Sequence, residues 1–224
     1  MRKTDYQLIR SKRRTIAICI GRDGSVTVRA PHRTALNTIE RFVSEKENWI
    51  QEKSTQMSEQ EADRKRFCVS PGSQLPLLGK NYSVELGSGV AFDGTRFFVP
   101  DQDYTVFRPK LEQLYKNLAR QIIEQRVQHY SKLTGWVPEG VRIGSAKTSW
   151  GSCSGQNKLN FTWRLVLAAP EQIDYVVVHE LAHLKEHNHS ARFWKLVEGI
   201  FPDYLSRRAR LKKLGENLQK FNLG

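Results

Sequence analysis

Residues 179–189, HELAHLKEHNH, hold four of the chain's six histidines and restrict its fold more than any other stretch. On an α-helix, His179 and His183 lie about 40° apart around the axis and about 6 Å apart along it, so both imidazoles can bind one ion. Glu180 then lies next to His179, where its carboxylate can face a metal-activated water. The spacing H-E-x-x-H therefore predicts a helix with two zinc ligands and a general base. Pro170 and Glu171 suit the first turn of that helix.

A tetrahedral catalytic zinc site needs a third protein ligand and leaves its fourth position to water. His187 would lie about 12 Å along an unbroken helix from His179, which is too far for both to reach one ion. His189 would point about 240° away from His183 on the same helix, so it is a ligand only if the helix stops first. We therefore predict one zinc ion bound by His179, His183 and His189, with His187 exposed or in contact with a ligand.

The sequence offers a place for that stop just beyond residue 186. Asn188 tolerates a left-handed conformation at a helix end, and Ser190 can cap a new helix through ARFWKLVEGIF. The spacing of the three histidines equals that of metzincins, but Glu186 stands where metzincins have glycine. The only methionines, Met1 and Met57, precede the motif, so the methionine turn of metzincins is absent. We therefore do not expect a true metzincin.

Composition and local patterns predict an α+β protein. The chain has 224 residues, of which 39% are hydrophobic and 26% charged, as expected for a globular protein with a packed core. Two β-rich stretches, 14–31 around Asp23-Gly24 and 70–100 around Asp93-Gly94, contain hairpin signals. An amphipathic helix follows residue 36 and continues as either a solvated helix or a linker, and a long helix runs from about residue 107 to Gly135.

These elements predict two lobes. Residues 1–100 form a β-rich N-terminal lobe with one amphipathic helix, and residues 101–224 form a zincin-like metallohydrolase lobe. In the second lobe, two extended segments around SGQNK form a hairpin, and the active-site helix packs on this small β-sheet. On the long helix, Leu111, Leu114, Leu118, Ile122 and Tyr130 are expected on one side.

Location and redox state follow from what the sequence lacks. No apolar run reaches the roughly 20 residues that span a bilayer, and the basic N-terminus is followed by no apolar signal region. Cys19, Cys68 and Cys153 are widely spaced and form no C-x-x-C pair, so we expect them to be reduced. We therefore expect a cytoplasmic protein.

Four motifs together resemble the YgjP-like metallopeptidase family, a zincin family related to SprT-like zinc proteases: TSWGSCS, LNFTWRLVLAAP, IDYVVVHELAHL and NHSARFW. The likeness covers nearly the whole chain. It implies a zinc-dependent hydrolase with ligands at His179, His183 and His189 and a general base at Glu180. Its substrate stays open, because members are called peptidases, SprT-like relatives act on proteins crosslinked to DNA, and a nucleoside triphosphate pyrophosphatase activity has also been attached to the family.

Three functions therefore compete. A zinc metallopeptidase needs an open groove, and a peptide could add as a strand to the edge of the 151–162 hairpin. A metal-dependent nucleoside triphosphate pyrophosphatase would use Lys147, Lys158 and Arg164 to bring positive charge to the ion. A nucleic-acid-binding protein with a merely structural metal would use the net charge of +13, with the basic N-terminus and the C-terminal helix as a surface for nucleic acid or nucleotides. The same surface would suit a DNA-associated, SprT-like protease. We prefer the peptidase.

Other residues are weaker candidates for the site. Trp150, Trp163 and Trp194 suit a cleft, but the core is favoured. Cys153 suits packing better than nucleophilic attack. Candidates to stabilise the oxyanion or to orient a ligand are Arg164, Tyr175, Tyr204, Glu198 and Asp203, each of which also has a structural explanation. The C-terminal helix has apolar residues at Leu211, Leu214, Leu218 and Phe221.

Overall fold

The computed structural model describes residues 5–218, without the side chains of 64–66 and 216–218. The described chain is α+β and divides into two compact units, one ending at Phe67 and one covering Cys68–Leu218. We expected a boundary at residue 100. The division lies earlier because the β-rich stretch after Phe67 contacts the helices of the second unit. No helix among the described residues is both long enough and apolar enough to cross a bilayer.

The first unit is a three-stranded sheet with two helices. Strands β1 (Gln7–Ser11), β2 (Ala17–Ile20) and β3 (Val26–Pro31) pair in the order β1-β3-β2. The hairpin at Asp23-Gly24 forms as expected, with Gly24 at φ 84°. The parallel strand β1 was not expected. The core consists of Val28, Ala30, Ile39, Val43 and Ile50.

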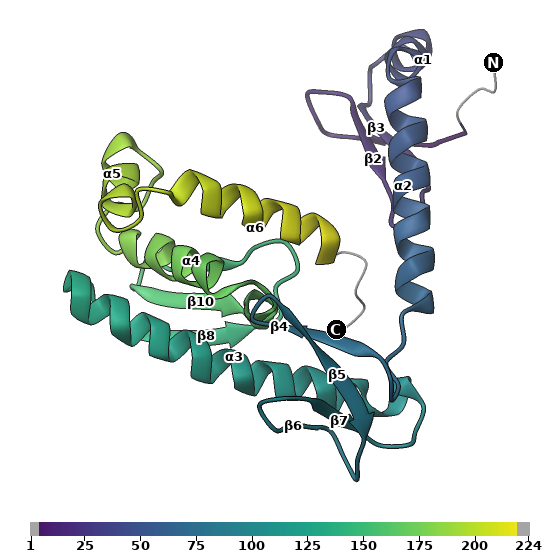
Figure 1. Cartoon of the computed structure of the whole chain (residues 1–224). Helices are drawn as coiled ribbons and strands as arrows, with labels where there is room; N and C mark the ends of the chain where they lie inside the picture. The colour runs from purple at the N-terminus through teal and green to yellow at the C-terminus, as the bar shows by residue number, and fades with distance from the viewer. Residues whose placement is uncertain (1–4, 219–224) are drawn as a thin grey trace. The chain divides into compact units, whose positions relative to one another are not determined.

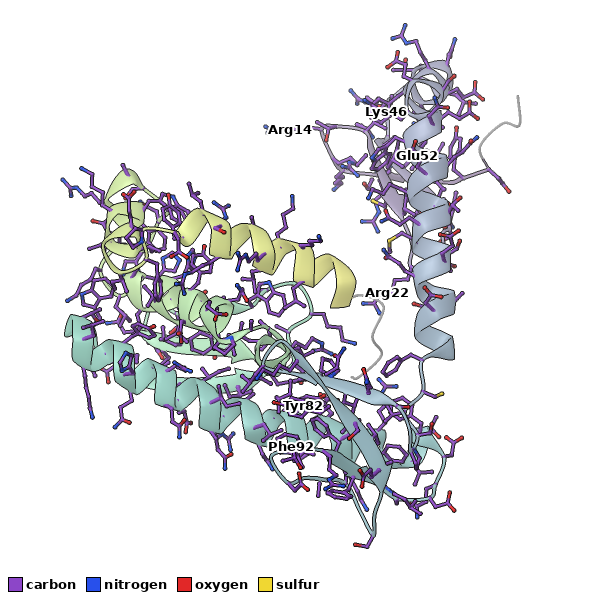
Figure 2. The ribbon with its side chains drawn as sticks, in the orientation of Figure 1. Arg14, Arg22, Lys46, Glu52, Tyr82 and Phe92 are labelled. Atoms are coloured by element: carbon purple, nitrogen blue, oxygen red, sulfur yellow. The ribbon has the colours of Figure 1, made fainter. Side chains whose placement is uncertain are left out.

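The two helices of this unit meet at Lys46, where α1 (Leu36–Glu45) gives way to α2 (Glu47–Arg66). The polar stretch after residue 53 is therefore a helix and not a linker. Two basic side chains of the unit, Arg14 and Arg22, belong to the turns between its strands (Figure 2). The predicted joint surface of this basic segment and the C-terminal helix stays a prediction, because the two segments belong to different units.

The second unit contains two small sheets and four α-helices among its described residues. The first sheet, ordered β4-β5-β7-β6, is formed by β4 (Gln74–Leu77), β5 (Lys80–Leu86), β6 (Ala91–Phe92) and β7 (Phe97–Val99). The second, ordered β8-β10-β9, is formed by β8 (Gly140–Gly144), β9 (Gly151–Cys153) and β10 (Lys158–Thr162). The helices are α3 (Tyr104–Thr134), the 3-10 helix η1 (Trp163–Leu167), α4 (Pro170–Ala182), α5 (Ala191–Ile200) and α6 (Tyr204–Leu218).

Helix α3 is the long helix expected from the sequence, and it forms one layer of the second unit. Asp103 caps its first turn by accepting a hydrogen bond from the Thr105 amide, and Gly135 ends it in the left-handed region. In Figure 1, α6 lies beyond α4, and α4 also packs directly against α3 and against β9. The histidine-bearing helix is thus enclosed by other elements of its own unit.

The buried face of α3 differs from the expected one by a single position. Its fully buried residues recur about every four positions and include Leu111, Tyr115, Ala119 and Ile123. The expected Leu114, Leu118 and Ile122 are only half-buried on the flank. Tyr115 takes the central place because its ring stacks on Trp163 at 5.4 Å and its hydroxyl donates to the Pro76 carbonyl at 2.8 Å.

The β4–β5 hairpin fixes the chain just before α4. Its turn residues, Leu78 and Gly79, both have positive φ, and the Leu78 amide donates to the Val166 carbonyl at 2.7 Å. Gly79 lies so close to Ala169 that an added Cβ would be 2.8 Å from the Ala169 Cβ. In the same sheet, Tyr82 and Phe92 meet edge to face at 5.2 Å (Figure 2).

We predict that Gly79→Ala destabilises the protein through this contact. Gly72→Ala is the matched control, because Gly72 also has a positive φ but an added Cβ would meet nothing within 4 Å. Urea denaturation should show that Gly79→Ala lowers the free energy of unfolding by about 1–3 kcal/mol more than the control does, the usual cost of overpacking. Equal losses in both variants would show that the contact with Ala169 contributes nothing.

Candidate metal centre and its cleft

Helix α4, which is buried on most sides, carries His179 and Glu180, and His183 is its C-cap. Pro170 occupies the first helical turn with Glu171 beside it, as expected. Val177, Val178, Leu181 and Ala182 are fully buried and contact the neighbouring elements. Packing therefore fixes the rotation of α4 about its axis, and with it the side to which both histidines point.

The backbone leaves the helix between the second and third histidines. Helix α4 ends at Ala182, with His183 as its C-cap, so the helix stops earlier than residue 186. The Glu186 amide donates to the Ala182 carbonyl at 3.0 Å, and the chain then turns. The expected left-handed conformation at Asn188 was wrong, because Leu78 and Asn157 are the only non-glycine residues with positive φ among those described.

The second helix begins where the sequence predicts. Ser190 is the N-cap of α5, and its hydroxyl accepts a hydrogen bond from the Phe193 amide at 3.3 Å. This cap holds His189 at the bend between α4 and α5. His187, by contrast, is exposed and lies outside the histidine cluster.

Three imidazoles form a nearly equilateral triangle. The ring centroids are 5.0 Å apart for His179 and His183, 4.9 Å for His179 and His189, and 4.8 Å for His183 and His189. Their ligand atoms all lie within 4.8 Å of one another. Among the described residues, His179, His183 and His189 form the group of three side chains that could hold a metal ion.

The donor set fits a divalent cation with nitrogen ligands. The Nε2 atoms of His179 and His189 face each other at 3.0 Å, close to the separation of about 3.3 Å that tetrahedral zinc with bonds near 2.05 Å would require. His183 Nδ1 lies 3.0 Å from the Glu186 carbonyl oxygen, so it carries the proton and leaves Nε2 with its lone pair. Burial and the neighbouring imidazoles lower the pKa of His179 to about 3, and burial lowers that of His183, so both rings are neutral at pH 7.

Aromatic packing holds the rings in place. Phe193 is fully buried, and its ring centroid lies 4.8 Å from that of His179, 4.5 Å from His183 and 4.8 Å from His189. Trp194 stacks on His189 at 5.5 Å. These contacts matter most for His179, whose buried Nδ1 has no hydrogen-bond partner among the described residues.

Glu180 is buried beside the histidines. Glu180 is 5% exposed, and burial raises the pKa of its carboxyl to about 8. Space for the carboxyl exists because residue 151 is glycine: an added Cβ would lie 2.7 Å from both Cγ and Oε1 of Glu180. A divalent cation nearby would favour the carboxylate and so oppose the effect of burial.

A cavity of about 620 Å³ opens onto His179 and Glu180. One wall is formed by β9, the residue before it and α4, through Trp150, Gly151, Tyr175 and Val176. The opposite wall is formed by α6, through Leu205, Arg208, Ala209, Leu211 and Lys212. The cleft lining therefore combines one histidine of the cluster, a buried carboxyl, aromatic and aliphatic surface, and two cationic side chains.

The other predicted residues are divided between the core and the cleft. Trp163 is fully buried, as favoured, whereas Trp150 lines the cleft. The thiol of Cys153 has a raised pKa through burial and the nearby Glu180 carboxyl, which agrees with packing and not with nucleophilic attack. Tyr175 lines the cleft, whereas Tyr204 stacks on Trp194 at 5.2 Å.

The remaining polar candidates lie outside the cleft lining. Arg164 covers Trp163 and donates to the Ser145 carbonyl. Asp203 pairs with Arg207 at 2.8 Å, and Glu198 is exposed. On α6, Leu211 is buried and Leu214 half-buried, whereas Leu218 and Phe221 lie outside the described side chains.

Sequence reasoning missed four residues of the site. Gly151 and Phe193 shape it, and Arg208 and Lys212 bring positive charge to it. A signal existed for Gly151, because TSWGSCS is one of the motifs that carry the family resemblance. No local signal indicated which basic residues of α6 would face the cleft.

Comparisons with known proteins show which family the chain resembles. A family model described as YgjP-like, metallopeptidase domain, matches residues 14–214, which include parts of both compact units. Among solved structures, the metallopeptidase zymogen of Pyrococcus abyssi, abylysin, has 28% sequence identity and a TM-score of 0.38, over 41% of this chain and 92% of that chain. No curated protein matches the chain. The resemblance inferred from the sequence is confirmed.

We predict that His179→Ala, His183→Ala and His189→Ala each abolish stoichiometric zinc binding, because each removes one corner of the triangle. His187→Ala is the control and should keep about one zinc per chain by elemental analysis. In thermal unfolding, zinc at about 100 times its Kd should stabilise the control by about 2.7 kcal/mol and the three ligand variants far less. A wild-type zinc content in His189→Ala would contradict the assignment of the third ligand.

We predict that Gly151→Ala impairs hydrolysis while zinc stays bound, because the new methyl group displaces the Glu180 carboxyl. A displacement of about 1 Å is expected to cost on the order of 100-fold in kcat. Gly155→Ala, in the same hairpin, is the control, since an added Cβ there meets nothing within 4 Å. Unchanged activity in Gly151→Ala with normal zinc content would show that the carboxyl need not lie where the structure has it.

Proposed function

We propose that this chain, which belongs to the YgjP-like metallopeptidase family, is a zinc peptidase with ligands at His179, His183 and His189 and with Glu180 as general base. The observation that carries the proposal is the triangle of imidazoles with a buried carboxyl directly beside it. Three neutral nitrogen donors favour zinc among the common divalent cations. The cavity is lined by His179 and Glu180, so a substrate in it would reach the ion that the three histidines would hold.

When bound, zinc would polarise the scissile carbonyl and lower the pKa of a water molecule to about 7. Glu180 accepts a proton from the attacking water and delivers it to the leaving amine. Burial raises the pKa of this carboxyl to about 8, and a bound divalent cation would lower it again. A carboxyl balanced between these two effects can take a proton from water and return it near pH 7. Phe193 and Trp194 exclude water from behind the imidazoles and keep their ring planes fixed.

The edge of the second sheet suits an extended peptide. In the order β8-β10-β9, strand β9 has β10 on one side only, and its first residue, Gly151, contacts Glu180. A peptide that adds to this edge would pass directly in front of the carboxyl. Tyr175 lines the same cleft, and burial raises the pKa of its hydroxyl, so the phenol stays protonated and available as a donor to the oxyanion.

Hydrolysis of a nucleoside triphosphate is the second candidate function. The basic residues named for it from the sequence, Lys147, Lys158 and Arg164, do not line the cleft. Arg208 and Lys212 do, and two cations near a metal ion also suit phosphate oxygens. The peptidase is preferred because the cleft adjoins a strand edge and is largely lined by aromatic and aliphatic side chains.

We predict that Glu180→Gln retains zinc and loses at least 100-fold in kcat on unfolded protein or peptide, because a carboxamide cannot accept the proton from water. Glu198→Gln, which changes an exposed carboxyl outside the cleft, should behave as wild type. The assay includes nucleoside triphosphates with detection of phosphate and pyrophosphate. If the zinc-loaded Glu180→Gln protein hydrolyses peptide at the wild-type rate, Glu180 is not the general base. If pyrophosphate is released in a Glu180-dependent manner and no peptide is cleaved, the second function is the correct one.

A further inference from the structure

Helix α6 presents a regular stripe of side chains to the cleft. Leu205, Arg208, Ala209 and Lys212 follow the spacing i, i+3, i+4 and i+7, so they lie on one face of the helix, and all four line the cavity. Arg208 and Lys212 are one turn apart on this face. The cationic wall therefore stands opposite the wall that carries His179 and Glu180.

Arg208 is held near the metal centre without a carboxylate partner. Its guanidinium carbon lies 5.2 Å from the centroid of the Trp194 ring, and that ring stacks on His189. Neighbouring Arg207, by contrast, forms an ion pair with Asp203 and donates a hydrogen bond to the Glu171 carbonyl. Among the side chains that the structure describes, neither Arg208 nor Lys212 forms an ion pair.

The cleft lining has one acidic group, Glu180, and it lies on the opposite wall next to His179. The α6 side of the cleft is consequently positive, although aliphatic side chains flank both cations. An arginine offers a planar fork of donors that matches a carboxylate, and a lysine adds a point charge. Partial burial of such a pair by a bound substrate strengthens the attraction, because water is displaced from around it.

We propose that Arg208 and Lys212 form a carboxylate subsite that makes this enzyme prefer peptides with an acidic group close to the scissile bond. The inference rests on the proposed peptidase function and adds its substrate class. The carboxylate comes from an aspartate or glutamate side chain or from the peptide's C-terminus. In either case the peptide chain lies between β9 and α6, with the bond to be cleaved at His179 and Glu180.

The test measures kcat/KM for peptides that differ at one position near the cleavage site, with glutamate, glutamine or lysine there. Each peptide is prepared with a free and with an amidated C-terminus. Wild type should prefer the acidic peptide by about tenfold or more, as expected for one charge-assisted contact. Loss of rate on replacing glutamate by glutamine assigns the side chain as the recognised group, and loss on amidation assigns the C-terminal carboxylate.

The decisive variants reverse the charge of the cleft wall. Arg208→Glu with Lys212→Glu should favour the lysine peptide over the glutamate peptide, and the neutral pair Arg208→Gln with Lys212→Gln should show no preference. The matched control is Arg210→Glu with Lys213→Glu, which makes the same change in net charge on the same helix at exposed positions outside the cleft. This control should keep the wild-type preference, because Arg210 and Lys213 do not line the cleft. Long-range attraction would change the preference equally in both double variants, so a change in the cleft variant alone identifies a local contact.

Binding separates this inference from the proposed function. Tryptophan fluorescence of the zinc-loaded Glu180→Gln protein, with Trp150 in the cleft, reports peptide binding without cleavage. If wild type cleaves no peptide, the proposed function fails, and the binding comparison between cleft and control variants still decides the subsite. The inference is overturned if acidic and neutral peptides are cleaved or bound equally, if the control variant loses the preference too, or if the cleft variants impair only triphosphate hydrolysis.

Discussion

Three imidazoles can share one cation only if the backbone leaves the helix between the second and the third, and the rest of the site depends on that bend. The end of α4 at Ala182 and the cap at Ser190 produce it. Phe193, in the first turn of α5, then packs against all three rings. Because Phe193 is fully buried against all three rings, it limits how they can turn and keeps their nitrogen atoms close together.

The chemistry of the cleft comes from segments that are far apart in the chain. Strand β9 contributes a glycine whose missing side chain leaves room for the Glu180 carboxyl, and α6 contributes the opposite wall. A residue without a side chain is thus as important to the proposed proton transfer as the carboxyl itself. Part of the net charge of +13 is located at this cleft, because Arg208 and Lys212 line it.

Elements with strong local signals could be predicted from the sequence. The hairpin at Asp23-Gly24, the end of α3 at Gly135, the start of α4 at Pro170 and the cap at Ser190 all depend on dihedral preferences or hydrogen bonds within a few residues. Features set by distant contacts could not. The buried face of α3 is shifted by one position because Tyr115 finds both the Trp163 ring and the Pro76 carbonyl, and neither partner is visible from the helix sequence.

The sequence by itself determined which residues could form the metal centre, because helical geometry places His179 and His183 together and leaves His189 as the third donor once the chain bends. Only the tertiary structure decided which side chains surround that centre. Burial of the Glu180 carboxyl depends on the approach of β9, and selection of Arg208 and Lys212 from the basic residues of α6 depends on how α6 packs on α4. Spacing along a helix is a local property, whereas burial and charge in a cleft belong to surfaces that meet only after folding.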